Sequence, residues 1–243
     1  MKKKLGFYTE IAFFLGLAIL AFGTSMTKYG GGMTIFGIPM GGMSMVVAPV
    51  FIIADGFKEL FNLTIPDGLL YGITECLFQA IILALTMIVM RKAKLCYLLS
   101  FAAAVIYSGI LTLSNVLIFE KIPVTLPAQI VIYILGVIFC CAGIALLLYG
   151  YFPPEAYEMF VKEISAKFKK PISIVKIFYD CGSLVLSLIL CLVFWSFGNI
   201  GVGTIVCAFL NGILIGLFQK LYSKIFNFKD KFKLRKYFEE SEK

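Results

Sequence analysis

Two acidic residues lie inside long apolar stretches of the sequence. Glu75 belongs to YGITECLFQAIILALTMIVM, and Asp180 belongs to FYDCGSLVLSLILCLVFWSF. A carboxyl group is costly in hydrocarbon, so at this depth it normally faces the interior of a helix bundle or a wet cavity. There it can carry a proton or balance the charge of a cationic substrate. Alternatively, each carboxyl group is neutral, hydrogen-bonded to a neighbouring helix, or near enough to the interface to reach water.

A second segment with groups suited to binding lies close to the end of the sequence. Thr204 and Asn211 offer a hydroxyl and an amide to a ligand, together with the backbone near Gly201 and Gly203. Small residues equally allow two helices to approach closely, so helix packing is the alternative interpretation of this segment.

A third candidate is a glycine-rich segment in the first quarter of the chain. Gly41, Gly42 and Ser44 precede the run MVVAPVF. A half-helix that begins here would direct its free N–H groups at an anion or a carboxylate. Flexibility of a loop alone would also explain these glycines.

The residue types present argue against a metal or cofactor site. The chain has no histidine, so the buried acids are the only intramembrane groups expected to relay protons near neutral pH. Its seven cysteines show no CxxC spacing and are expected to be buried thiols that act as small hydrophobes. We therefore expect no metal and no cofactor.

Catalytic motifs are incomplete. The pair Tyr179-Asp180 and the run GVGT at 201–204 are similar to the YD and GxGD motifs of intramembrane aspartyl proteases, but Thr204 takes the place of the second aspartate. The sequence contains neither HExxH nor GxSxG. Because neither an acid dyad nor a nucleophile with its base is present, we expect that the protein is not an enzyme.

Membrane-spanning helices are the elements that must position these residues. Hydrophobic residues make up 60% of the 243 residues and charged residues only 15%, which is far more apolar than a soluble domain requires. A spanning helix needs about 20 apolar residues. Six runs satisfy this requirement, so we predict an all-α membrane protein with six transmembrane helices: 11–28, 68–90, 95–117, 127–150, 172–197 and 199–219.

The basic residues predict the orientation. Most of the 22 Lys and Arg residues fall in loops that share one face if the six spans are right, and cytoplasmic loops carry such an excess. Both termini are therefore expected in the cytoplasm, with the spans crossing the plasma membrane. The net charge of +8 then reflects orientation and contact with anionic lipid rather than nucleic-acid binding. Only Lys28, Lys58 and Lys121 fall on the other face.

The segment 30–54 is apolar enough to span but is not expected to cross. Crossing would place the basic cluster at 91–94 outside and would invert every later loop. Six glycines and the prolines at 39 and 49 make an unbroken helix unfavourable. We expect a broken or re-entrant segment, which is tolerated where it is buried in protein or lines a cavity.

Short matches predict an internal repeat. The pattern Leu15-Gly16, Gly23, Tyr29-Gly30 recurs 120 residues later, and Glu75-Cys76 matches Asp180-Cys181 at an offset of 105. Three crossings per half would invert the second half relative to the first, as in many secondary transporters. The expected divisions are a first repeat at 1–123, a second at 124–219 and a cytoplasmic basic tail at 220–243.

The second repeat is expected to contain an interfacial helix in PPEAYEMFVKEISAKFKK. Tyr157, Phe160, Val161, Ile164 and Phe168 share one helical stripe, and Glu155, Glu158, Glu163 and Lys167 are expected to point elsewhere. The basic tail is expected to begin as a helix on anionic lipid, with partner docking as the alternative.

The sequence resembles the YczE/YyaS/YitT family of bacterial integral membrane proteins. The resemblance is clearest in GVGTIVCAFLNGILIGLF at 201–218, which is similar to the closing GxGT helix of that family, and it extends to the glycine-rich stretch after the first span and to FYDCG. The chain departs from the family pattern at Cys207, where Asn is frequent, and at Ile213, where Pro is frequent. The resemblance implies a bacterial membrane protein with a suspected role in transport.

Three functions remain open from the sequence. The first is a small-solute transporter, coupled or not to protons, with a central site between inverted repeats. The second is a membrane-embedded substrate-binding subunit of a system similar to the energy-coupling-factor transporters. The third is an assembly or interaction protein without a solute. The expected partners are the lipid bilayer, an unidentified solute, and either further copies of the chain or a partner subunit.

Overall fold

The computed structural model describes residues 5–35, 38–41, 47–62, 64–91, 95–123, 125–195 and 200–232. In these segments the chain forms eight α-helices, one short 3-10 helix and four short strands. Among the residues proposed to bind a solute, Gly42 and Ser44 fall outside the described segments.

Six long apolar helices confirm the six predicted spans. Each has at least 18 residues and a stretch with no more than two charged side chains, so each is long enough to cross a bilayer. The chain is therefore a multi-pass membrane protein. The helices are α1 (Thr9–Gly31), α3 (Asp67–Met90), α4 (Leu95–Leu117), α5 (Leu126–Leu147), α7 (Ile172–Phe194) and α8 (Val202–Ile225).

The outer faces of these helices are apolar and exposed, which is consistent with contact with lipid. Examples are Ile88 on α3, Phe178 and Val193 on α7, and Phe209 on α8, each more than half exposed. Apolar groups of this size are seldom left in water in such numbers.

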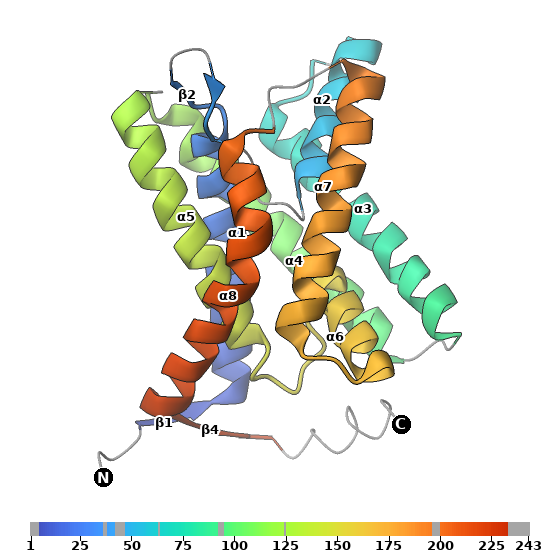
Figure 1. Cartoon of the computed structure of the whole chain (residues 1–243), viewed down its shortest axis with the longest axis vertical. Helices are drawn as coiled ribbons and strands as arrows, with labels where there is room; N and C mark the ends of the chain where they lie inside the picture. The colour runs from blue at the N-terminus through green and yellow to red at the C-terminus, as the bar shows by residue number, and fades with distance from the viewer. Residues whose placement is uncertain are drawn as a thin grey trace.

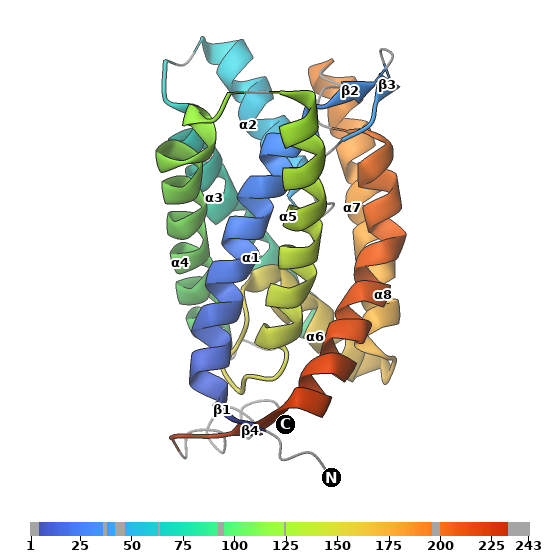
Figure 2. The ribbon, with the colours of Figure 1, turned by 90° about the vertical axis from the view of Figure 1, so that its left-hand side faces the viewer.

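Helices α1 and α5 form the centre of the bundle and run antiparallel in close contact (Figure 2). Gly16 faces Gly143, and Gly23 faces Gly136 and Cys140. A Cβ atom at Gly23 would lie 2.7 Å from the Cys140 backbone nitrogen, and one at Gly16 would lie 2.9 Å from the Gly143 carbonyl oxygen. Only glycine permits this approach, because any side chain would meet backbone that has no room to move.

The segment after α1 is broken, as expected. Two short strands, β2 (Thr34–Ile35) and β3 (Ile38–Pro39), pair antiparallel after α1 ends. The helix α2 (Ala48–Phe61) then follows and packs against α3 and α7. In Figure 1 these elements lie at the end of the bundle opposite the chain termini.

The predicted amphipathic helix of the second half is α6 (Ala156–Phe168), which packs against α3, α4 and α7 at the end of the bundle that carries the termini (Figure 1). Tyr157 and Val161 of the expected apolar stripe are buried. The expected direction of the acids is wrong, because Glu155, Glu158 and Glu163 are at most 5% exposed. The helix directs these carboxyl groups into the protein, whereas Phe168 is 60% exposed.

Corresponding elements of the two halves pack alike. Helix α1 packs on α4 as α5 packs on α8, α3 packs on α4 as α7 packs on α8, and α2 packs on α7 as α6 packs on α3. Pro66 and Pro171 precede α3 and α7 with nearly the same backbone angles. The same two helices are followed by Arg91 and Trp195, whose φ angles are 52° and 53°.

The two ends of the chain are joined to each other. Strand β1 (Leu5–Tyr8) pairs in parallel with β4 (Phe226–Lys229), directly after α8 (Figure 1). The Glu10 carboxylate accepts hydrogen bonds from the backbone N–H groups of Lys231 and Phe232 and from the Tyr151 hydroxyl. The start of the expected basic tail thus continues α8 to Ile225 and then forms β4.

Candidate functional site

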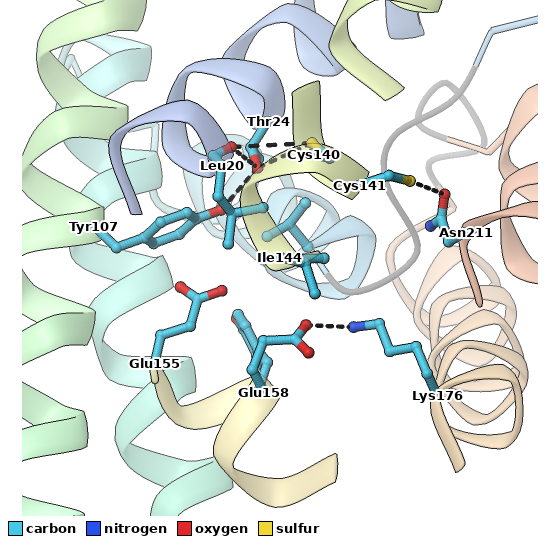
Figure 3. A pocket seen from close by; sticks show the side chains of 12 residues that line it. Leu20, Thr24, Tyr107, Cys140, Cys141, Ile144, Glu155, Glu158, Lys176 and Asn211 are labelled. Atoms are coloured by element: carbon cyan, nitrogen blue, oxygen red, sulfur yellow. Dashed lines mark hydrogen bonds and ion pairs between the residues drawn. The ribbon is translucent and has the colours of Figure 1, made fainter. Parts of the chain in front are cut away.

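A small cavity lies beside the crossing of α1 and α5 (Figure 3). Its volume of about 20 Å³ has room for roughly one water molecule. One part of its wall is apolar or weakly polar and comes from α1, α5 and the residue before α2: Leu20, Val47, Cys140, Cys141 and Ile144.

The rest of the cavity wall is polar and comes from five helices and the residue before α6. Helix α6 begins after Glu155 and carries Tyr157 and Glu158, while α7 supplies Lys176 and α8 supplies Asn211. The Tyr107 hydroxyl from α4 donates a hydrogen bond of 2.9 Å to Thr24 on α1. Side chains from both halves of the chain therefore meet in one small volume.

Lys176 forms a buried ion pair at the cavity. Its Nζ atom lies 2.6 Å from Glu158 Oε1 and 3.6 Å from Asp180 Oδ1, and all three side chains are at most 2% exposed. Lys176 and Asp180 are four residues apart on α7, which places them on the same face of that helix. Asp180 is thus connected to the cavity through Lys176, and it also has Asn211 as a near neighbour.

Glu75 is connected to the same cavity through Gln79. The Gln79 side-chain amide donates a hydrogen bond of 3.0 Å to Glu75 and one of 3.4 Å to Glu155. Its carbonyl oxygen accepts a hydrogen bond of 3.2 Å from the backbone N–H of Ala156, at the start of α6. Because Glu75 and Gln79 are also four residues apart, α3 presents both side chains to α6.

The site has more acidic groups than its bases can neutralise. Four carboxyl groups, from Glu75, Glu155, Glu158 and Asp180, are each at most 3% exposed. Within the described segments, Lys176 is the one cation among the polar groups at the cavity. Four buried carboxylates cannot all be ionised beside one ammonium group, because each bare charge has a large desolvation cost.

The outer acid of the group, Glu155, precedes α6 and lies outside the spans. Burial raises the pKa of its carboxyl well above the usual value, and the neighbouring Glu158 and Glu75 raise it further. The groups that face it come from several elements. They are Glu158 and Tyr157 of α6, Glu75 of α3, Tyr107 of α4, Cys140 of α5 and Lys176 of α7.

Several acceptor atoms in the site lack a donor. Among the described residues, Glu75 Oε2, Glu158 Oε2 and both carboxyl oxygens of Asp180 have no hydrogen-bond partner. The contact of 3.6 Å with Lys176 gives Asp180 an ion pair but is too long for a hydrogen bond. Buried acceptors are nearly always satisfied in folded proteins, so these atoms are available to a proton, a water molecule or a bound group.

The predicted site residues fall into two classes in the structure. Glu75, Asp180 and Asn211 belong to the cavity or to its immediate partners. Thr204 instead accepts a hydrogen bond from the Gly201 backbone N–H at the start of α8, so it caps that helix. Gly41 packs on the backbone at the end of α1, where a Cβ atom would lie 2.5 Å from the Gly30 and Gly31 carbonyl oxygens.

Sequence reasoning missed Glu155, Glu158, Gln79 and Lys176. The first two stand in a short charged segment that resembles a surface helix, so nothing in the pattern distinguishes them from solvated acids. Lys176 does carry a recognisable feature. It lies within the predicted span 172–197, four residues before Asp180, and a lysine at that position needs a buried acid as its partner.

The comparison with known families extends over most of the chain. The model of a family described as Family of unknown function (DUF6198) matches residues 7–220, from β1 almost to the end of α8. That match does not name the YczE/YyaS/YitT family. No curated protein and no solved structure matches the chain.

Proposed function

We propose that this chain, which belongs to the family of unknown function DUF6198, is a membrane transporter for a small solute and binds protons at its central carboxyl groups. The single observation that carries the proposal is the group of four buried carboxyls and Lys176 at a cavity between the two halves. Polar groups of this kind within a membrane bundle mark pathways for solutes and protons. If these side chains had only a structural role, apolar residues in their place would stabilise the core as well or better.

The proposed mechanism is alternating access by two inverted repeats. The matched packing of the two halves supports this arrangement, with α1 to α4 corresponding to α5 to α8. Leu20 and Cys140, which both line the cavity, are 120 residues apart, the same offset that relates the glycines of α1 and α5. The cavity would therefore lie on the pseudo-two-fold axis, where repeat transporters place their substrate sites.

Proton binding follows from the charge imbalance. A carboxyl group such as Glu155, whose pKa is raised by burial, keeps its proton at a pH at which an exposed glutamate has lost it. It releases that proton when a cation arrives or when the site opens to water. Solute binding and proton binding would then be linked, and one would drive movement of the other.

The proposal is tested with purified protein in liposomes that contain a pH-sensitive dye. Amines, amino acids, carboxylates and sugars are added in turn, and we expect at least one class to change the internal pH. Substitution of Glu155→Gln should abolish this change. Glu59→Gln makes the same chemical change on the exposed face of α2 and serves as the matched control.

Two results would contradict a proton-linked transporter. One is a wild-type protein that responds to none of the solute classes. The other is an undiminished response in both Glu155→Gln and Glu158→Gln, with all proteins incorporated to the same extent.

A further inference from the structure

The site already holds one primary ammonium group, that of Lys176. Its Nζ atom lies 2.6 Å from Glu158 and 3.6 Å from Asp180, and 5.5 Å from the centre of the Tyr179 ring. An ammonium group has three N–H donors and no acceptor, so it suits a site built from carboxylates and an aromatic ring. The geometry around Lys176 shows an ammonium group held by two of these acids.

Acceptors remain on the cavity side of this ion pair. Glu158 Oε2 has no hydrogen-bond partner within the described part of the chain, and Glu155 receives a long hydrogen bond of 3.4 Å from Gln79. Figure 3 shows both carboxyl groups directed from the start of α6 and the residue before it toward the space beneath Leu20 and Ile144. A second donor-rich cation therefore has two carboxyl groups to bind.

The opposite wall of the cavity selects for an organic cation. Leu20, Val47 and Ile144 offer hydrocarbon, whereas a hard metal ion needs oxygen ligands on all sides. In the described segments, no group of three or more acids, cysteines or histidines is placed to hold a metal ion. The chemistry of both walls matches a molecule with an ammonium head and a short hydrocarbon part. Such a molecule is larger than the one water for which the cavity of about 20 Å³ has room, so its binding requires the helices around the cavity to separate.

We propose that the central cavity binds a small primary amine in its protonated form. The ammonium group lies between Glu155 and Glu158, and the hydrocarbon part lies against Leu20, Val47 and Ile144. This inference names the substrate class of the proposed transporter and rests on that function. Because the amine and a proton compete for Glu155, binding of the amine releases a proton, and the exchange conserves charge at the site.

The inference is tested by binding, with the full-length protein in detergent and n-butylammonium as the probe. Thermal unfolding is followed in the presence of n-butanol or of the chloride salt of n-butylammonium, tetramethylammonium or sodium. We expect n-butylammonium alone to raise the unfolding temperature of the wild type by several degrees. In Glu155→Gln the dissociation constant should rise roughly tenfold or more, because one charged acceptor is lost. Glu59→Gln should bind as the wild type does.

A variant of the apolar wall provides a second readout in case Glu155→Gln does not fold. Val47→Phe fills the cavity without removing an acid, so it should abolish the response to n-butylammonium while the ion pair of Lys176 stays intact. Lys176→Met should bind n-butylammonium more tightly than the wild type, because the internal ammonium group no longer competes.

Three results would overturn the inference. They are no response of the wild type, a response limited to Lys176→Met, and an equal response to tetramethylammonium or sodium. The amine site and the transport function can be refuted independently of each other. Amine binding without any flux in liposomes would remove the transporter and keep the amine site, whereas proton-linked flux of another solute without amine binding would remove the amine site alone.

Discussion

At the scale of single residues, Lys176 is the group on which the charge balance of the cavity depends. Its ammonium group partly neutralises the negative charges of Glu158 and Asp180, from which it lies 2.6 and 3.6 Å away. All three side chains are nearly excluded from solvent. A buried pair of this kind adds little net stability, but removing one partner leaves the other as an uncompensated buried charge. Stability and function should therefore respond very differently to substitutions of the two partners.

Replacement of Lys176 by Met should destabilise the protein strongly. We expect a loss of about 3–5 kcal/mol in the free energy of unfolding, because two carboxyls lose their cation. The double variant Lys176→Met/Glu158→Gln should recover part of this loss, because one buried charge is removed with its partner. Thermal unfolding in detergent measures both. A double variant less stable than Lys176→Met alone would contradict the ion-pair account.

Stability should also depend on pH through Glu155. The pKa of this carboxyl is raised in the folded protein, so its contribution to stability is complete below the pKa of an unfolded glutamate. It is lost as the pH rises through the higher pKa of the folded state. We therefore expect the unfolding temperature to fall from mildly acidic toward alkaline pH, and to fall less in Glu155→Gln. Equal slopes in both proteins would contradict this assignment.

Whether the sequence predicts a residue of the site depends on the sequence segment in which that residue lies. Glu75 and Asp180 are conspicuous because apolar residues surround them for a full membrane thickness. Glu155 and Glu158 are not, because their burial results from tertiary contacts of α6 with α3 and α7. Thr204 and Gly41 attract attention by type, yet their roles are helix capping and backbone packing.

At the scale of elements, the contact between α1 and α5 defines the core. Gly16, Gly23 and Gly30 recur every seven residues on α1, and Gly136 and Gly143 do so on α5. Seven residues are nearly two helical turns, so the glycines form a stripe along each helix. The sequence shows this spacing as part of a repeat. Contact between the two glycine stripes is a feature of the tertiary structure, which the spacing alone does not predict.

Substitution of Gly23→Ala should separate α1 from α5. The new Cβ atom would lie 2.7 Å from the Cys140 nitrogen and 3.0 Å from the Gly136 carbonyl oxygen, and neither backbone can yield without moving its helix. We expect a loss of about 1–3 kcal/mol, as for other overpacked cores. Thermal unfolding and the fraction of monodisperse protein after purification measure the effect.

Gly182→Ala on α7 is the matched control. A Cβ atom at that glycine meets no described atom within 4 Å, so no clash is expected. Alanine favours the helix over glycine by up to about 1 kcal/mol, and the variant should unfold at the same temperature as the wild type or slightly higher. Equal losses in Gly23→Ala and Gly182→Ala would show that helix contact is not the cause.

Helix boundaries were the most predictable feature at this scale. The expected spans agree with the observed helices within three residues, except that α8 continues to Ile225. The agreement is close because length and hydropathy alone decide which segments can cross a bilayer. The direction of α6 was not predictable, because its apolar stripe and its acids are both buried and the periodicity does not distinguish a membrane surface from a protein interior.

At the scale of the whole molecule, the pairing of β1 with β4 joins α1 to α8 at one end of the bundle. At the opposite end the corresponding helices α4 and α5 are joined by the chain itself, through a 3-10 turn at Phe119–Lys121. If the two repeats exchange conformations during transport, the non-covalent junction at the terminal end must open or bend. A covalent bond between β1 and β4 would prevent this.

A disulfide between the strands should therefore stop transport. Tyr8 and Lys229 are register partners in the parallel pair, so the double variant Tyr8→Cys/Lys229→Cys is expected to form a disulfide under oxidising conditions. We expect proton-linked flux in liposomes to be lost on oxidation and restored by a reducing agent, while each single variant stays active. Full flux in protein that mass spectrometry shows to be cross-linked would contradict the opening of this junction.

The neighbouring positions of β1 and β4 have one more consequence. A peptide linker between these strands would close the backbone into a ring. The ring can be reopened between α4 and α5, at the end of the bundle opposite the termini (Figure 2). The resulting circular permutant would begin with α5 and end with α4 and still make the same contacts. Which half is synthesised first would then be immaterial to the architecture that the finished protein adopts.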